Sequence, residues 1–215
     1  MKAIGQSASI KDFKDFNYIY IDKTEQIYSL LGQRRVFFSR PRRFGKSLVL
    51  DTIATLFEQG VEPYFKDTWI YDKWPQITYP VLRLNFLDFG NDSLEKFTIK
   101  FNNYVSEFAK ELQLEHDVVG IDPAETLLKL CNALKDKKIV ILIDEYDCQL
   151  TANINCYETT FVKQKFRQDI FLSLSTALAT LLYVDWLPQV NGSPRILFVF
   201  HRGSLFTVPS KLFRR

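Results

Sequence analysis

Few residues in this chain are of the types that build disulfide frameworks or histidine metal sites. Its 215 residues include 3 cysteines and 2 histidines. The cysteines, Cys131, Cys148 and Cys156, are odd in number and form no CxxC pair, which argues against a disulfide framework or a zinc site. Because His116 and His201 are the only histidines, a histidine-rich metal centre is excluded. This cysteine usage fits reducing, intracellular conditions.

The sequence also lacks a long apolar run and a strong charge of either sign. Residues 1–16 contain no apolar stretch typical of a signal peptide. The most apolar uncharged run, residues 170–184, is shorter than the roughly 20 residues that a membrane-spanning helix needs. The formal net charge of +3 does not by itself predict binding to nucleic acid. We therefore expect a cytoplasmic protein that does not enter a membrane.

What the chain does contain is ample material for a core. Hydrophobic residues make up 47% of it and aromatic residues 15%, which argues against disorder. Apolar or alternating segments predict strands at residues 18–21, 36–38, 81–86, 139–143 and 196–200. Segments with helical spacing, or with helix-start signals, predict helices at residues 24–31, 46–58, 93–112, 122–134 and 161–182, the first capped by Asp22 or Thr24. Residues 61–80 are expected to form an irregular connection.

Strands and helices alternate along the chain, and this pattern predicts the fold class. The run 139–143 is apolar on both faces, as the central strand of a parallel sheet should be. Alternation of this kind indicates a three-layer α/β fold with a mainly parallel central sheet.

The string RPRRFGKS at residues 40–47 lies between a predicted strand and a predicted helix, the context that a Walker A phosphate loop requires. The free N–H groups and partial positive charge of a helix N-terminus hold phosphate oxygens. Gly45 would let the backbone approach the phosphates, Lys46 would reach the outer ones, and the Ser47 hydroxyl would bind Mg²⁺.

The loop departs from the pattern GxxxxGK[ST] at one place, because Arg40 stands where the first glycine is usual. The alternative interpretation is a chance GKS tripeptide at a helix start. The nucleotide-binding residues expected here are Arg40, Pro41, Arg42, Arg43, Phe44, Gly45, Lys46, Ser47 and Leu48.

Two acids follow the strand predicted at 139–143, which is the pattern of a Walker B motif. The carboxyl ends of parallel strands face the ligand crevice of an open α/β sheet. Asp144 would hold Mg²⁺ through water, and Glu145 would orient and deprotonate the attacking water. The alternative for Asp144 is an ordinary acid in a turn. Asp147 is expected to cap or support the structure.

Three segments together resemble a known family. They are NYIYIDKT at 17–24, SRPRRFGKS at 39–47 and IDEYD at 143–147. They are similar to the AAA-ATPase-like proteins of bacteria and archaea, in which the RPRRFGKS loop itself replaces the first glycine. The resemblance covers roughly residues 10–155. It implies an ATPase core of the additional-strand P-loop class, which in that family is often fused to a PD-(D/E)XK nuclease-like domain.

The resemblance weakens towards the C-terminus. The family usually continues from a late strand into a Thr-Gly segment, whereas the apolar run at 196–200 is followed by His201, Arg202 and Gly203. We therefore expect a chain that is truncated or altered after about residue 157, without room for a nuclease-like domain. The expected organisation is an N-terminal strand–helix element at 1–35, an ATPase-like domain at 36–200 and a tail at 201–215.

The function expected from these observations is an ATP-binding, Mg²⁺-dependent hydrolase with Glu145 and Lys46 as catalytic residues. ATP is favoured over GTP because no guanine-reading NKxD string is present. One alternative is a nucleotide-dependent binding module, or a remnant that binds ATP without turnover. Another is a nucleic-acid-associated protein that uses the arginines near the loop. A protein partner and an oligomer are left open. Lys23 and Thr24 are expected to be structural.

Overall fold

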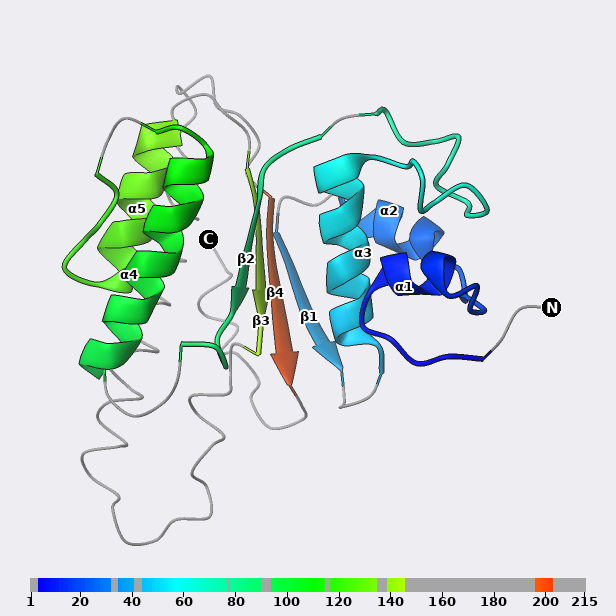
Figure 1. Ribbon diagram of the computed structural model, residues 1–215, viewed down its shortest axis with the longest axis horizontal. Helices are drawn as coiled ribbons and strands as arrows, with labels where there is room; N and C mark the ends of the chain where they lie inside the picture. The colour runs from blue at the N-terminus through cyan, green and yellow to red at the C-terminus, as the bar shows by residue number, and fades with distance from the viewer. Residues whose placement is uncertain are drawn as a thin grey trace, which may run out of the picture.

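The computed structural model describes residues 4–31, 35–40, 44–76, 78–89, 94–114, 117–134, 139–145 and 196–202. Its helices are α1 (Ile10–Asp15), α2 (Thr24–Leu31), α3 (Lys46–Gln59), α4 (Leu94–Glu111) and α5 (Pro123–Leu134). Its strands are β1 (Arg35–Arg40), β2 (Val81–Asn85), β3 (Val140–Asp144) and β4 (Ile196–Arg202). The chain is thus an α/β protein (Figure 1).

The four described strands form one parallel sheet in the order β1-β4-β3-β2. β4 therefore lies between the strand that precedes the loop at 40–47 and the strand that ends in Asp144. Because all four strands run in the same direction, their carboxyl ends meet at one edge of the sheet (Figure 1). The mainly parallel sheet expected from the sequence is confirmed for these strands.

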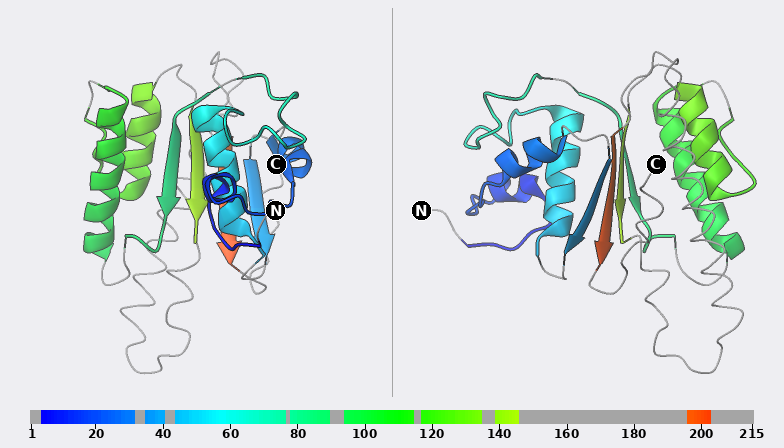
Figure 2. Two further views of the ribbon diagram at one scale, coloured as in Figure 1. Left: turned by 45° about the vertical axis from the view of Figure 1, so that its right-hand side comes forward. Right: turned by 180° about the vertical axis from the view of Figure 1, so that it is seen from behind.

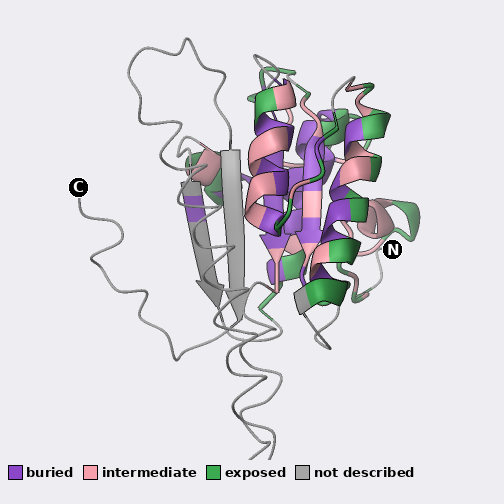
Figure 3. Ribbon diagram, turned by 90° about the vertical axis from the view of Figure 1, so that its left-hand side faces the viewer, coloured by how far each residue is buried: buried purple, intermediate pink, exposed green. Residues whose placement is uncertain are grey.

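Helices cover both faces of the sheet. α3 lies against one face with α1 and α2 beside it, and α4 and α5 lie on the other face (Figures 1 and 2). Strand β3 supplies both cores by alternation: Val140 and Leu142 pack towards α3, whereas Ile141 and Ile143 pack towards α4 and α5. Figure 3 shows the buried residues gathered between the described helices and the sheet.

Helical spacing of apolar residues explains how α4 and α3 pack. In α4, Phe97, Phe101 and Val105 recur every four residues and are all fully buried. In α3, Ile53 and Leu56 are fully buried against the opposite face of the sheet. The helix ends where Gly60 adopts a positive φ of 78° and its N–H donates to the Leu56 carbonyl, a conformation that glycine adopts readily.

The strand predicted at residues 18–21 is wrong. Residues 19–21 belong to no strand, although their side chains alternate: Tyr20 is half-buried, while Ile19 and Ile21 are 47% and 74% exposed. Alternation reports burial on one side only, and a strand also needs a hydrogen-bonded neighbour. The short helix α1 was not predicted, and the helix predicted at 161–182 lies outside the described residues.

The polar residues of the segment at 22–24 are structural, as expected for Thr24. Asp22 caps α2 by accepting the Thr24 N–H at 2.8 Å, and its other oxygen accepts the Trp69 N–H at 2.6 Å. Thr24 is fully buried, and its Oγ1 accepts the Ile70 N–H at 3.2 Å. These bonds hold the irregular connection after α3 against the N-terminal helices. None of the described helices is long and apolar enough to cross a membrane.

Candidate functional site

The loop after β1 leads into α3 at the carboxyl edge of the sheet. Gly45, directly before the helix, has φ 71° and ψ 26°, the left-handed conformation that only glycine adopts without cost. A Cβ added at Gly45 would meet no atom within 4 Å. The backbone conformation, and not a shortage of space, is therefore what requires glycine here.

The first turn of α3 presents the features of a phosphate-binding helix end. The Val49 N–H donates to the Gly45 carbonyl at 3.0 Å and closes this turn. The amides that precede it are those that an α-helix leaves without an intrahelical acceptor, at the end that carries partial positive charge. Lys46 is 8% exposed, whereas Ser47 is exposed and Phe44 is 58% exposed. The arrangement can hold an anion beside the Lys46 side chain.

The Asp144 carboxylate at the end of β3 contacts both the helix start and its own neighbour. The Ser47 hydroxyl donates to Asp144 Oδ2 at 3.2 Å. The Glu145 N–H donates to Asp144 Oδ1 at 2.9 Å. Both carboxylate oxygens are thus oriented, one by α3 and one by the turn that follows the strand.

Glu145 has an uncommon backbone conformation for a residue with a side chain. Its φ is 52°, in the left-handed region, a conformation that costs about 1–3 kcal/mol and that Asn17, Gln76 and Gln113 share. Glu145 is half-buried, and its Oε2 atom is shielded from solvent. The strain supports a role for Glu145 beyond that of a surface turn.

The oxygen atoms of Ser47 and Asp144 fit a magnesium ion. A hydroxyl has one hydrogen and two lone pairs, so Ser47 Oγ can donate to Asp144 and still offer its oxygen to a cation. Mg²⁺ prefers oxygen ligands and is usually held by one or two protein groups together with water and phosphate. The described residues contain no group of three His, Cys, Asp or Glu side chains that could hold a metal unaided. A site completed by phosphate matches this donor set.

Asn85 joins the site although the sequence reasoning did not select it. It ends β2 directly opposite Asp144 in the parallel register. The Phe86 N–H donates to the Asp144 carbonyl at 3.2 Å, and the Asn85 amide donates to Asp88 Oδ1, also at 3.2 Å. In the sequence Asn85 is recognisable only as a polar residue at the end of a predicted strand, and the register of β2 against β3 is what shows that it lies beside Asp144.

The structure brings together part of the predicted site. Gly45 directly precedes α3, Lys46 and Ser47 begin it, and Ser47 contacts Asp144, which in turn accepts the N–H of Glu145. Leu48, in the first turn of α3, is half-buried and packs against the apolar core that α3 shares with the sheet. Of Arg40 only the backbone is described, at the end of β1. The remaining predicted nucleotide-binding residues, Pro41, Arg42 and Arg43, lie outside the described residues.

Known proteins match most of this chain. The model of the family described as "Predicted AAA-ATPase" matches residues 6–183, a wider range than the 10–155 expected from the motifs. A curated protein of Azotobacter chroococcum mcd 1, described as "Uncharacterized protein in vnfD 5'region", is 33% identical over 157 residues. That alignment covers 68% of this chain and 28% of the relative, so the chain corresponds to less than a third of the relative's length. No solved structure matches the chain significantly.

Proposed function

The chain belongs to the family described as "Predicted AAA-ATPase", and on that premise we propose that it is an ATP-binding protein with a Mg²⁺-dependent ATPase core. The observation that carries the proposal is the 3.2 Å hydrogen bond from Ser47 Oγ to Asp144 Oδ2. It joins the helix that follows the phosphate loop to the acidic end of β3. A nucleotide triphosphate and its metal ion must touch both places at once.

The fold proposed with this function is the three-layer, additional-strand type of P-loop fold. In its support, β4 lies between β1 and β3, and helices lie on both faces of the sheet (Figure 1). We also propose that residues 1–35 form an element packed on an ATPase-like domain at 36–200, followed by a tail at 201–215, of which His201 and Arg202 still belong to β4. The contact between α1 and α3 supports the first part of this division, because Ile10 is buried in the core that α3 shares.

In the proposed binding mode, the backbone at Gly45 and the first turn of α3 hold the phosphates, and the Lys46 ammonium neutralises the outer ones. Ser47 and Asp144 hold Mg²⁺, Asp144 through water. When bound, the ion would offset the negative charge on the phosphate oxygens. The residues proposed to surround the nucleotide are Arg40, Pro41, Arg42, Arg43, Phe44, Gly45, Lys46, Ser47 and Leu48.

Glu145 is proposed as the base for hydrolysis. It follows the proposed metal-holding Asp144 directly, and the hydrogen bond from its N–H to Asp144 fixes its backbone at the strand end. From there its carboxylate would orient a water molecule for attack on the γ-phosphate and take a proton from it. Asp144 would order the water around the ion.

Two variants test binding and turnover separately. We expect Lys46→Ala to lose ATP binding, and Glu145→Gln to bind MgATP without releasing phosphate. The control is Lys129→Ala, because Lys129 is on the distant helix α5 and pairs with Glu125 at 3.1 Å. Wild-type protein that binds MgATP without turnover would reduce the proposal to a nucleotide-dependent binding module. Binding is measured by the thermal shift that MgATP causes, with MgGTP for comparison. Wild-type protein that shows no shift with MgATP would contradict the proposed function.

A further inference from the structure

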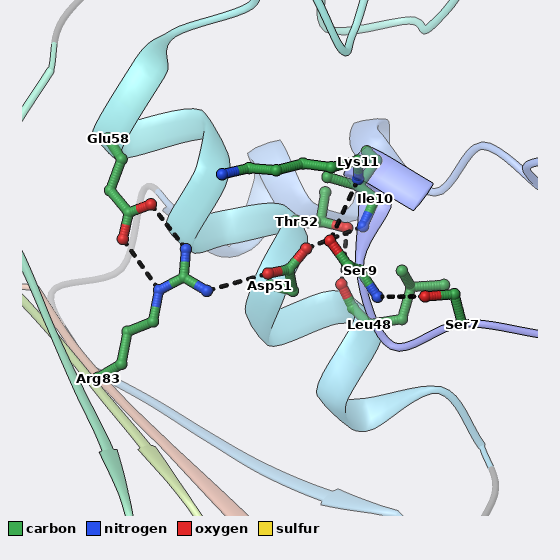
Figure 4. Close-up of polar contacts among 9 residues, drawn as sticks. All are labelled: Ser7, Ser9, Ile10, Lys11, Leu48, Asp51, Thr52, Glu58 and Arg83. Carbon is green, nitrogen blue, oxygen red and sulfur yellow. Dashed lines mark hydrogen bonds and ion pairs between the residues drawn. The ribbon is translucent and has the colours of Figure 1, made fainter. Parts of the chain in front are cut away.

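Arg83, in the middle of β2, lies between two carboxylates of α3. Its Nη1 is 2.9 Å from Asp51 Oδ1, and its Nη2 is 2.7 Å from Glu58 Oε2. Its Nε donates to Glu58 Oε1 at 2.9 Å, so the contact with Glu58 uses both carboxylate oxygens (Figure 4). Asp51 and Glu58 are about two helical turns apart, or about 10 Å along the axis. The guanidinium therefore joins two separate turns of α3 to one point on the sheet.

This network is only partly open to solvent. The side chains of Arg83, Asp51 and Glu58 are 33%, 16% and 30% exposed. Burial lowers the pKa of Arg83, but the hydrogen bonds and charges of Glu58 and Asp51 outweigh it and raise that pKa above its ordinary value. The arginine stays charged, and its planar fork matches the carboxylate geometry in a way that a lysine would not.

The apolar contacts and the ion pairs of α3 restrain different movements of the helix. Burial of Ile53 and Leu56 determines which face of α3 meets the sheet. Apolar attraction is non-directional, whereas ion pairs depend on direction and add a restraint against a slide of the helix along its axis. A guanidinium held from two turns opposes a slide in either direction, because each direction lengthens one of the two contacts. Arg83 thereby sets the axial position of α3.

That axial position matters at the proposed metal site. Ser47 is one turn before Asp51 on α3, and its hydroxyl reaches Asp144. Asp144 is opposite Asn85, and Asn85 is two residues after Arg83 on β2. Arg83 is thus connected to Asp144 in two ways: through Asp51 and Ser47 on α3, and through Asn85 on β2.

We propose that Arg83 is a positioning residue, which holds α3 where Ser47 and Asp144 can share one magnesium ion. This inference rests on the proposed function and assigns a role to a residue outside the phosphate loop and the acidic pair. Asp51 has a further contact, because its Oδ2 accepts the Ile10 N–H of α1 at 2.8 Å (Figure 4). Asp51 is thus held from the N-terminal segment and from β2 together.

The test measures metal affinity and not turnover. Mn²⁺ binding to protein saturated with a non-hydrolysable ATP analogue is followed by electron paramagnetic resonance. We expect Arg83→Met to weaken Mn²⁺ binding by about 10-fold or more, the size typical of a lost outer contact at a metal site. Binding of the metal-free analogue should stay nearly unchanged. Arg83→Lys, which keeps the charge but not the fork, should fall between Arg83→Met and the wild type.

A double-mutant cycle separates positioning from general stabilisation. If Arg83 acts through Ser47, then Arg83→Met will weaken Mn²⁺ binding far less in a Ser47→Ala background than in the wild type. Equal losses in both backgrounds would overturn the inference. If Arg83→Met fails to fold, Glu58→Gln takes its place in the cycle. It should also weaken Mn²⁺ binding far less in the Ser47→Ala background than in the wild type.

The remaining arms distinguish this inference from the proposed function. Lys14→Met removes an ion pair of 2.7 Å with Asp67, far from the strand ends, and should leave Mn²⁺ binding unchanged. Wild-type protein that binds no Mn²⁺ with the analogue would contradict the proposed function itself. Wild-type protein that binds it, with Arg83 variants of equal affinity, would contradict only the positioning role.

Discussion

Ser47 and Asp144 are 97 positions apart in the chain, yet the hydroxyl of one donates to the carboxylate of the other at 3.2 Å. The contact exists because α3 begins at the edge of the sheet where β3 ends. It uses the only hydrogen of the hydroxyl and leaves the oxygen lone pairs for a cation. The pair therefore links the candidate phosphate loop to the candidate metal-binding acid.

Ser47→Ala should raise the Mg²⁺ concentration needed for ATP binding by about 10-fold or more, because one of two protein oxygens near the ion is lost. ATP binding without metal should be nearly unaffected, since the backbone of the loop is intact. The measurement is ATP affinity across a Mg²⁺ titration. Ser29→Ala is the matched control, because the Ser29 hydroxyl donates to a carbonyl within α2, that of Glu25. Equal Mg²⁺ dependence in Ser47→Ala and wild type would contradict the assignment.

Gly45→Ala should lower the free energy of unfolding by about 1–2 kcal/mol, because alanine is strained at a φ of 71°. No clash adds to this cost, as the space around an added Cβ is open. Urea unfolding measures the change. Gly45→Asn should cost less, since asparagine tolerates the left-handed region better than alanine. A larger loss for the asparagine variant than for alanine would show that side-chain volume, and not φ, limits the position.

Asn102→Ala should lower the free energy of unfolding by about 1–3 kcal/mol, because it removes two hydrogen bonds of a buried side chain. Asn102 is 8% exposed; its Oδ1 accepts the Thr126 hydroxyl at 2.6 Å, and its Nδ2 donates to the Gly120 carbonyl at 2.9 Å. These bonds hold the loop between α4 and α5. The exposed neighbour Asn103 offers the matched control, and Asn103→Ala should be close to neutral in the same urea titration.

Stability should fall as the pH rises above about 10, with Tyr20 as one cause. Burial raises the pKa of Tyr20 from its ordinary value of 10.0, the hydrogen bond with Thr52 opposes the change, and the charge of Asp22 adds to it. The folded state therefore keeps the proton to a higher pH than the unfolded state. The stability that this supplies is complete below the unfolded pKa and is lost as the pH rises through the folded one.

Tyr20→Phe should accordingly make the decline in stability at high pH less steep. Urea midpoints measured between about pH 9 and about pH 11 report the slope. Tyr28→Phe is the control, because Tyr28 is 39% exposed. Identical slopes for the wild type and Tyr20→Phe would rule out Tyr20 as a source of the pH dependence.

Local patterns predicted the strand that carries Asp144 and the helix that begins at Lys46. The run at 139–143 is apolar on both faces because it lies between two cores. The residue before the helix at 46 is glycine, which adopts the left-handed conformation found there. The same kind of pattern failed at 18–21, where Tyr18 and Tyr20 are half-buried but residues 19–21 belong to no strand. Alternating burial is a property of a segment, whereas strand pairing needs a second segment.

The sequence by itself determined the chemistry of this protein's candidate site: a glycine, a lysine and a hydroxyl at one helix start, and two acids after one apolar strand. Only the tertiary structure decided which of these groups meet. It placed Ser47 against Asp144, put Asn85 beside that acid, and joined Arg83 to Asp51 and Glu58. The physical reason is that residue type and spacing control local conformation and burial, whereas proximity between distant segments follows from the order and register of strands in the sheet.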